Sequence, residues 1–78
     1  NIGREATVEY IFVAFDPKDR RDVIANGNVV GSTDNEIMLP ADFYRIELSG
    51  TGFAPPFWEG PISGTTPAEP LKIAFSHA

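Results

Sequence analysis

The sequence contains no cysteine, so no disulfide can support a chain of only 78 residues. Small domains bury a modest share of their surface and often depend on disulfides or metals. This chain must therefore be held together by packing of its large apolar side chains. One domain covering residues 1–78 is the expected organisation. Because the chain begins with Asn1 rather than methionine, we expect either a processed protein or, as the favoured alternative, a domain excised from a longer protein.

Histidine is almost absent, and the single one, His77, stands next to the last residue. Ser–His and Cys–His catalysis needs a base close to the nucleophile. A histidine in a solvated tail, as we expect here, does not supply one. The sequence therefore predicts no enzyme activity and no catalytic residues.

Basic residues are also scarce, with six Lys and Arg against eleven Asp and Glu and a net charge of −5. Nucleic-acid affinity comes mainly from clustered cations, and the one basic cluster, residues 18–22, is interleaved with aspartates. We expect no nucleic-acid partner. No apolar run approaches the roughly 20 residues of a membrane helix, so no direct membrane insertion is expected.

Metal and cofactor motifs are missing as well. Asp16, Asp19 and Asp22 are spaced by three, but basic residues lie among them and the glycine and glutamate of a calcium loop are lacking. The glycines at 27–31 and 50–52 lack the other features of phosphate loops. We expect no metal and no cofactor.

What the sequence does contain is short β-like segments separated by seven glycines and seven prolines. We predict an all-β fold, a small antiparallel β-sandwich of six to seven short strands with no substantial helix. The clearest alternation is in residues 43–49, where Tyr44, Ile46 and Leu48 share one face and Arg45 and Glu47 the other. The first strand, residues 7–15, is apolar on both faces and should be central or covered on both sides. The other expected strands are Asp22–Ala25, Asn28–Val30, Glu36–Leu39, Trp58–Ile62 and Leu71–Phe75.

Asn26-Gly27 separates two of these strands and is the pair that best tolerates a type I′ hairpin turn. We expect Gly31 to let the chain bend away from the hairpin. The hydroxyl of Thr33 can then bond to nearby backbone. These residues are predicted to reverse the chain rather than to bind a ligand.

Phe53, Phe57 and Trp58 lie in the long connection of residues 50–60, beside a diproline. Exposed rings of this kind stack on sugars or anchor protein partners. Alternatively, the connection folds back and its rings complete the core, and this second interpretation is favoured because large rings are more often buried.

Between residues 22 and 53, the spacing of Gly27, Gly31, Thr33, Pro40 and Tyr44 forms a pattern that resembles the PEGA-type domain. A glycine-bearing hairpin and a second glycine precede a threonine, then a Leu-Pro-small turn and a tyrosine-bearing strand that ends in glycine and an aromatic residue. Asp34 and Asp42 depart from that pattern, which usually has proline and glycine there. The matching positions are Gly27, Gly31, Thr33, Leu39, Pro40, Tyr44, Ile46, Leu48, Gly52 and Phe53.

The resemblance implies a small β-sandwich appended to larger bacterial or archaeal proteins of the cell envelope, in a periplasmic or extracellular location. It implies an accessory, interaction or spacer role without catalysis, with other domains of the parent chain or another protein as partners. The alternative is a carbohydrate-binding module that uses Phe53, Phe57 and Trp58 on a polysaccharide.

Overall fold

The computed structural model describes residues 8–78 of the chain, and in this range it forms eight strands and no helix. The predicted all-β sandwich is confirmed. The eighth strand is a two-residue segment within the long connection, where we expected only a loop. The strands are β1 (Val8–Asp16), β2 (Asp22–Ala25), β3 (Asn28–Ser32), β4 (Glu36–Pro40), β5 (Asp42–Leu48), β6 (Phe53–Ala54), β7 (Trp58–Ile62) and β8 (Leu71–His77).

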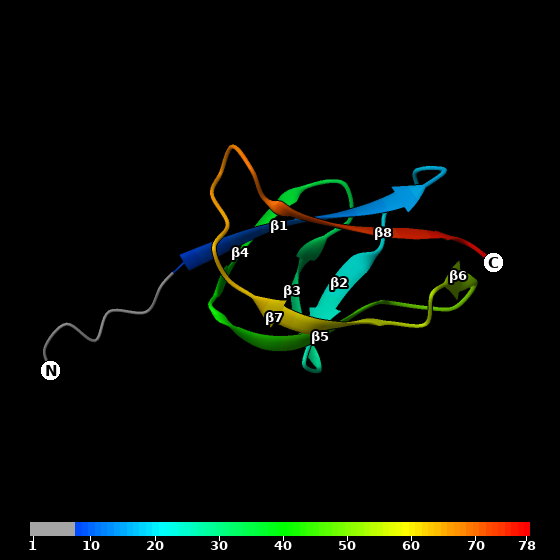
Figure 1. Cartoon of the computed structure of the whole chain (residues 1–78). Coiled ribbons are helices and arrows are strands. Elements are labelled where there is room, and N and C mark those ends of the chain that lie inside the picture. The colour runs from blue at the N-terminus through cyan, green and yellow to red at the C-terminus, as the bar shows by residue number, and fades with distance from the viewer. Residues whose placement is uncertain (1–7) are drawn as a thin grey trace, which may run out of the picture.

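The strands form two four-stranded sheets that face each other (Figure 1). The first sheet has the order β4-β1-β8-β6 and the second has the order β3-β2-β5-β7. All neighbours are antiparallel except β1 and β8, which run in parallel from the pair Ile11 and Leu71 to the pair Asp16 and Ser76. The predicted antiparallel arrangement therefore holds for every pair but this one. The sheet is mixed because β8 returns to it after the chain has passed through the second sheet. A parallel pair needs such a long crossover.

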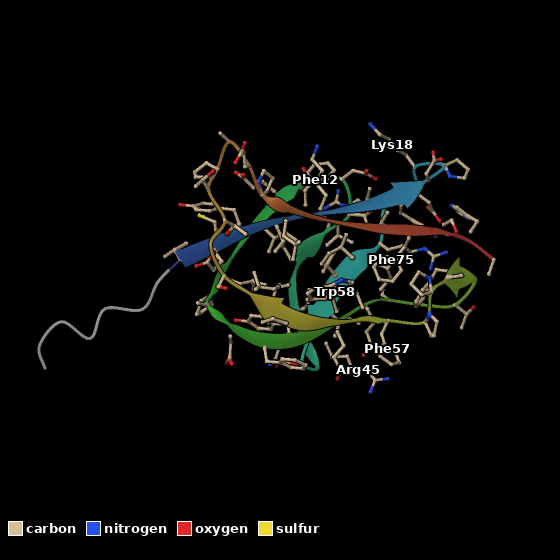
Figure 2. All side chains as sticks on the ribbon, viewed as in Figure 1. Phe12, Lys18, Arg45, Phe57, Trp58 and Phe75 are labelled. Carbon is tan, nitrogen blue, oxygen red and sulfur yellow. The ribbon has the colours of Figure 1, made fainter. Side chains whose placement is uncertain are left out.

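β1 is central in the first sheet, as predicted, with β4 on one side and β8 on the other. Its residues Glu9, Ile11, Val13 and Phe15 face the interior and are buried. On the opposite side Phe12 is half-buried and lies on the outer surface of the sheet (Figure 2). One apolar face of β1 therefore belongs to the core, and the other lies on a partly solvated surface.

The core draws on both sheets, and β5 contributes to it as its alternation predicts, with Tyr44, Ile46 and Leu48 buried. Fully burying one such side chain contributes about 1.5–3 kcal/mol. This burial replaces the missing disulfides as the source of stability. The other buried hydrophobic residues are Ile11, Val13, Phe15, Val23, Ala25, Ile37, Leu39, Ile62, Ile73 and Phe75.

Across residues 8–78 the chain forms no helix that is long and apolar enough to cross a membrane.

Candidate functional site

The three rings singled out in the sequence occupy different environments. Phe53 packs against the core and meets Phe75 edge-to-face, with 5.8 Å between ring centroids. Trp58 also packs against the core, and its indole carbons lie 3.2 Å from where a Cβ on Gly60 would stand. Glycine at this position of β7 therefore makes room for the indole. Figure 2 shows Trp58 on the inner side of β7 and Phe57 on the outer side.

Phe57 belongs to a surface that we call the β5–β7 face, formed by Phe43, Arg45, Phe57, Glu59 and Pro61. The guanidinium carbon of Arg45 lies 4.0 Å from the centroid of the Phe57 ring, a cation–π contact. Arg45 pairs in register with Glu59, and Phe43 with Pro61, so each pair lies on one side of the sheet. Phe43 is 56% exposed. The β5–β7 face therefore combines apolar rings with an arginine at the surface.

The Asn26-Gly27 turn joins β2 to β3, and both residues have positive φ, 49° and 87°. The structure thus agrees with the predicted chain reversal of type I′. The Asn26 side chain adds something that the turn pattern does not predict. Its Oδ1 accepts a hydrogen bond from the amide of Arg45 at 2.9 Å, and its Nδ2 donates to the carbonyl of Phe43 at 3.3 Å. The turn therefore also binds the β5 backbone.

Gly31 is needed for packing. A Cβ on Gly31 would lie 2.7 Å from Cγ1 of Ile37 and 2.9 Å from its Cδ1. Ile37 is a buried core residue of β4. The side chain of Ile37 thus fills the space that any larger residue at position 31 would require.

Thr33 is buried and bonds to the loop between β1 and β2, in agreement with the expected backbone bond of its hydroxyl. Its Oγ1 accepts a hydrogen bond from the amide of Arg21 at 3.0 Å and donates to the carbonyl of Asp19 at 3.1 Å. The amide of Thr33 donates to the carbonyl of Arg21 at 2.9 Å. Three bonds therefore fix this loop to the segment that follows β3.

Arg21 ties the same loop to the connection after β5. Its Nη1 donates to the carbonyls of Ser49 and Thr51 at 2.9 and 3.0 Å, and its Nε pairs with Asp19 at 3.1 Å. The guanidinium carbon lies 5.1 Å from the centroid of the Phe15 ring. Sequence analysis missed this role, because the partners of Arg21 are about 30 residues distant in the chain.

Pro40 and Tyr44 mark the passage from the first sheet to the second. The hydroxyl of Tyr44 donates a hydrogen bond to the carbonyl of Pro40 at 2.7 Å. Burial raises the pKa of Tyr44, and the nearby charge of Asp42 adds to the shift. The tyrosine therefore serves as a neutral hydrogen-bond donor at this corner.

Glu9 is a buried carboxylate on the inward face of β1. Its Oε1 accepts hydrogen bonds from the hydroxyl of Thr65 at 2.5 Å and from the Thr65 amide at 2.8 Å. Thr65 Oγ1 also accepts a bond from the amide of Tyr10. The bonds from Thr65 lower the pKa of Glu9. A lowered pKa favours the ionised form, in which the carboxylate accepts the bonds from Thr65.

His77 also has a structural contact that was not predicted. It is exposed, but it does not lie in a tail: it is the last residue of β8, pairs with Phe53, and stacks its ring on Phe15 with centroids 4.0 Å apart and planes 5° apart. Its Nε2 lies 2.9 Å from the carbonyl oxygen of Pro17.

The part of the chain that the structure describes contains no cavity of ligand size. Within the same residues, no three His, Cys, Asp or Glu side chains are placed to share a metal ion. The described surface thus offers faces, edges and loops rather than an enclosed site.

Comparisons of the chain with protein-family models, with curated proteins and with solved structures find no match.

Proposed function

We propose that this chain is a non-catalytic spacer and interaction domain of a longer protein of the cell envelope. The observation that supports a spacer is the parallel pairing of β1 and β8. The chain arrives at the start of β1 and departs at the end of β8, and these points lie at opposite ends of the sheet (Figure 1).

The separation follows from the register. Asp16 pairs with Ser76, and Val8 lies eight residue steps before Asp16 (16 − 8). At about 3.3 Å per residue, the start of β1 and Ser76, one residue before the end of β8, are roughly 26 Å apart along the strands. Antiparallel terminal strands would bring the flanking segments to the same end. The parallel pair instead holds them apart, as a spacer requires.

The β5–β7 face supports the interaction part of the proposal. Aromatic residues and arginine are enriched where proteins bind each other, and here Arg45 covers Phe57 beside the exposed Phe43. The expected partners are other domains of the parent chain or another protein. The envelope location rests on the resemblance to PEGA-type domains.

Replacement in the full-length gene product tests the proposal. Residues 8–78 are exchanged for an unrelated β-sandwich of the same end-to-end separation, or for a flexible Gly/Ser segment of equal residue number. For a spacer, the rigid replacement restores the activity of the parent protein and the flexible segment does not. Failure of both replacements, together with loss of activity in an Arg45→Ala/Phe43→Ser variant, would assign the function to interaction alone. Full activity with the flexible segment contradicts both roles.

The alternative, a carbohydrate-binding module, has weaker support because Phe53 and Trp58 pack against the core and only Phe57 lies on the outer face. A stacking site needs ring faces that a sugar can cover. Trp58 fluorescence during titration with polysaccharide distinguishes the two functions. A saturable change in the emission would support the alternative, and the spacer proposal predicts no change.

A further inference from the structure

We propose that the β1–β8 ladder is a mechanical clamp, which makes this domain resist stretching forces applied through its flanking segments. The inference rests on the proposed spacer function, because a spacer between two attached parts transmits the tension between them. It adds a property that a spacer need not have, namely resistance to that tension.

The direction of the two strands is the first argument. A pull on the segment before Val8 draws β1 backward along its own axis, and a pull on the segment after His77 draws β8 forward. The two strands are hydrogen-bonded neighbours, so this force slides one along the other. The hydrogen bonds of a parallel pair run between the two strands, slanted and evenly spaced, so sliding loads the bonds over the whole register from Ile11 to Asp16 together.

The location of the ladder is the second argument. Val13 and Phe15 of β1 and Ile73 and Phe75 of β8 are at most 3% exposed and belong to the core. Water has little access to this side of the ladder. Sliding would also drag these side chains past the second sheet, and a close-packed interior resists such displacement.

Attachments at both ends of the ladder are the third argument. Near the start of β1, Glu9 and Tyr10 bond to Thr65 in the segment that leads into β8. At the far end, His77 stacks on Phe15 and contacts the Pro17 carbonyl. The amide of Ala78 donates to the carbonyl of Gly52 at 2.9 Å. On its other side β1 pairs with β4 from Val8 to Phe12, so β1 is held at both of its edges.

The absence of cysteine allows a directional test by single-molecule stretching, because two introduced cysteines become the only handle sites. In the Val8→Cys/Ser76→Cys variant the force shears β1 against β8. In the Lys18→Cys/Ser76→Cys variant the force opens the same ladder from the pair Asp16 and Ser76, one pair at a time. All three positions are exposed. Equal urea midpoints for the two variants show that any difference in rupture force comes from direction.

At equal loading rates, we expect the shear variant to rupture at a force about two-fold higher or more, because forced unfolding follows the unfolding barrier, which is larger when the bonds break together. Equal forces, or a lower force in shear, would overturn the clamp. If a handle variant does not fold, stretching through proteins fused to both ends of the unsubstituted chain supplies the shear geometry. A force no higher than that of the Lys18 variant again overturns the proposal.

The result of the stretching experiment can be distinguished from the result of the replacement experiment. If the two handle variants rupture at equal forces and the rigid replacement restores activity, the clamp proposal is wrong and the spacer proposal stands. If the shear variant ruptures at the higher force but the flexible replacement gives full activity, the spacer proposal is wrong. The clamp is then a property of the fold without a role in spacing.

Discussion

The carboxylate of Glu9 accepts two hydrogen bonds from Thr65, one from its amide at 2.8 Å and one from its hydroxyl at 2.5 Å. This contact joins the first strand of the described chain to a loop 56 residues later. It places an ionised group at the edge of an apolar core, where each of these bonds favours the charged form.

The pH dependence of stability should show this contact. Bonds from Thr65 lower the pKa of Glu9 below its ordinary value of 4.5. The unfolded chain therefore binds the proton more readily, so the stabilisation is present above pH 4.5 and is lost as pH falls through the lowered pKa. Urea unfolding across this range should show the wild type more stable than Glu9→Gln at neutral pH, with the difference shrinking in acid. A difference that does not depend on pH would contradict this role.

Tyr44 should give the opposite behaviour on the alkaline side. Its pKa is raised from 10.0 by burial and by Asp42, so the folded state favours the protonated phenol. The stabilising contribution of Tyr44 is therefore fully present below pH 10 and is lost as pH rises through the raised pKa.

Tyr44→Phe loses the hydrogen bond to the Pro40 carbonyl and should be less stable by about 1 kcal/mol at neutral pH. In urea unfolding this loss should shrink at alkaline pH, where the wild type also weakens. An unchanged stability at neutral pH would show that the bond contributes nothing.

Gly27 tests backbone strain separately from packing. Its φ is +87°, and an added Cβ would meet no atom within 4 Å. Gly27→Val should therefore destabilise by about 1–2 kcal/mol through the left-handed conformation alone. Gly27→Asn is the matched control and should lose much less in urea unfolding, since Asn tolerates this conformation. Equal losses in the two variants would rule out conformational strain as the cause.

Gly31 tests packing. Because Ile37 would lie 2.7 Å from a Cβ at this position, Gly31→Ala should cost about 1–3 kcal/mol. Ile37→Ala removes the obstructing atoms at the expense of a cavity. The double variant should be more stable than the sum of the two single losses predicts, which a double-mutant cycle measures. Additive losses would show that the two positions do not interact.

These contacts show which features of the structure could be predicted from the sequence. Local signals were sufficient for the alternation of β5 and for the Asn26-Gly27 turn, because both depend on residues close together in the chain. A bond from the Thr33 hydroxyl to backbone was also expected, but its partners, Arg21 and Asp19, lie 12 and 14 residues earlier in the chain. The all-β sandwich followed from the spacing of strand-like segments between turns.

What the sequence did not predict depends on residues that are distant in the chain. Glu9 shares a face of β1 with buried apolar residues, and its partner Thr65 lies in a loop 56 residues later in the chain. We expected Gly31 to bend the chain, whereas its additional role, to admit Ile37, depends on how the two sheets meet. The parallel direction of β8 was also not predicted, because a strand pattern carries no information about which way the chain returns to a sheet.

The three rings illustrate the same limit. Their composition allowed both a displayed platform and a core plug, and favoured the plug only because large rings are more often buried. The structure places Phe53 and Trp58 against the core and Phe57 beneath Arg45. The register of β7 with β5 determines which face of the sheet each of the neighbouring rings Phe57 and Trp58 occupies.

The parallel pairing of β1 and β8 underlies both the spacer and the clamp, and a distance measurement tests it most directly. Spin labels on Val8→Cys/Ser76→Cys and on Lys18→Cys/Ser76→Cys report the separation of the ladder's two ends from a common position. The parallel register predicts a separation of roughly 26 Å along the strands for the first pair and a much shorter one for the second. A first pair that is as close as the second, or closer, would contradict the parallel register.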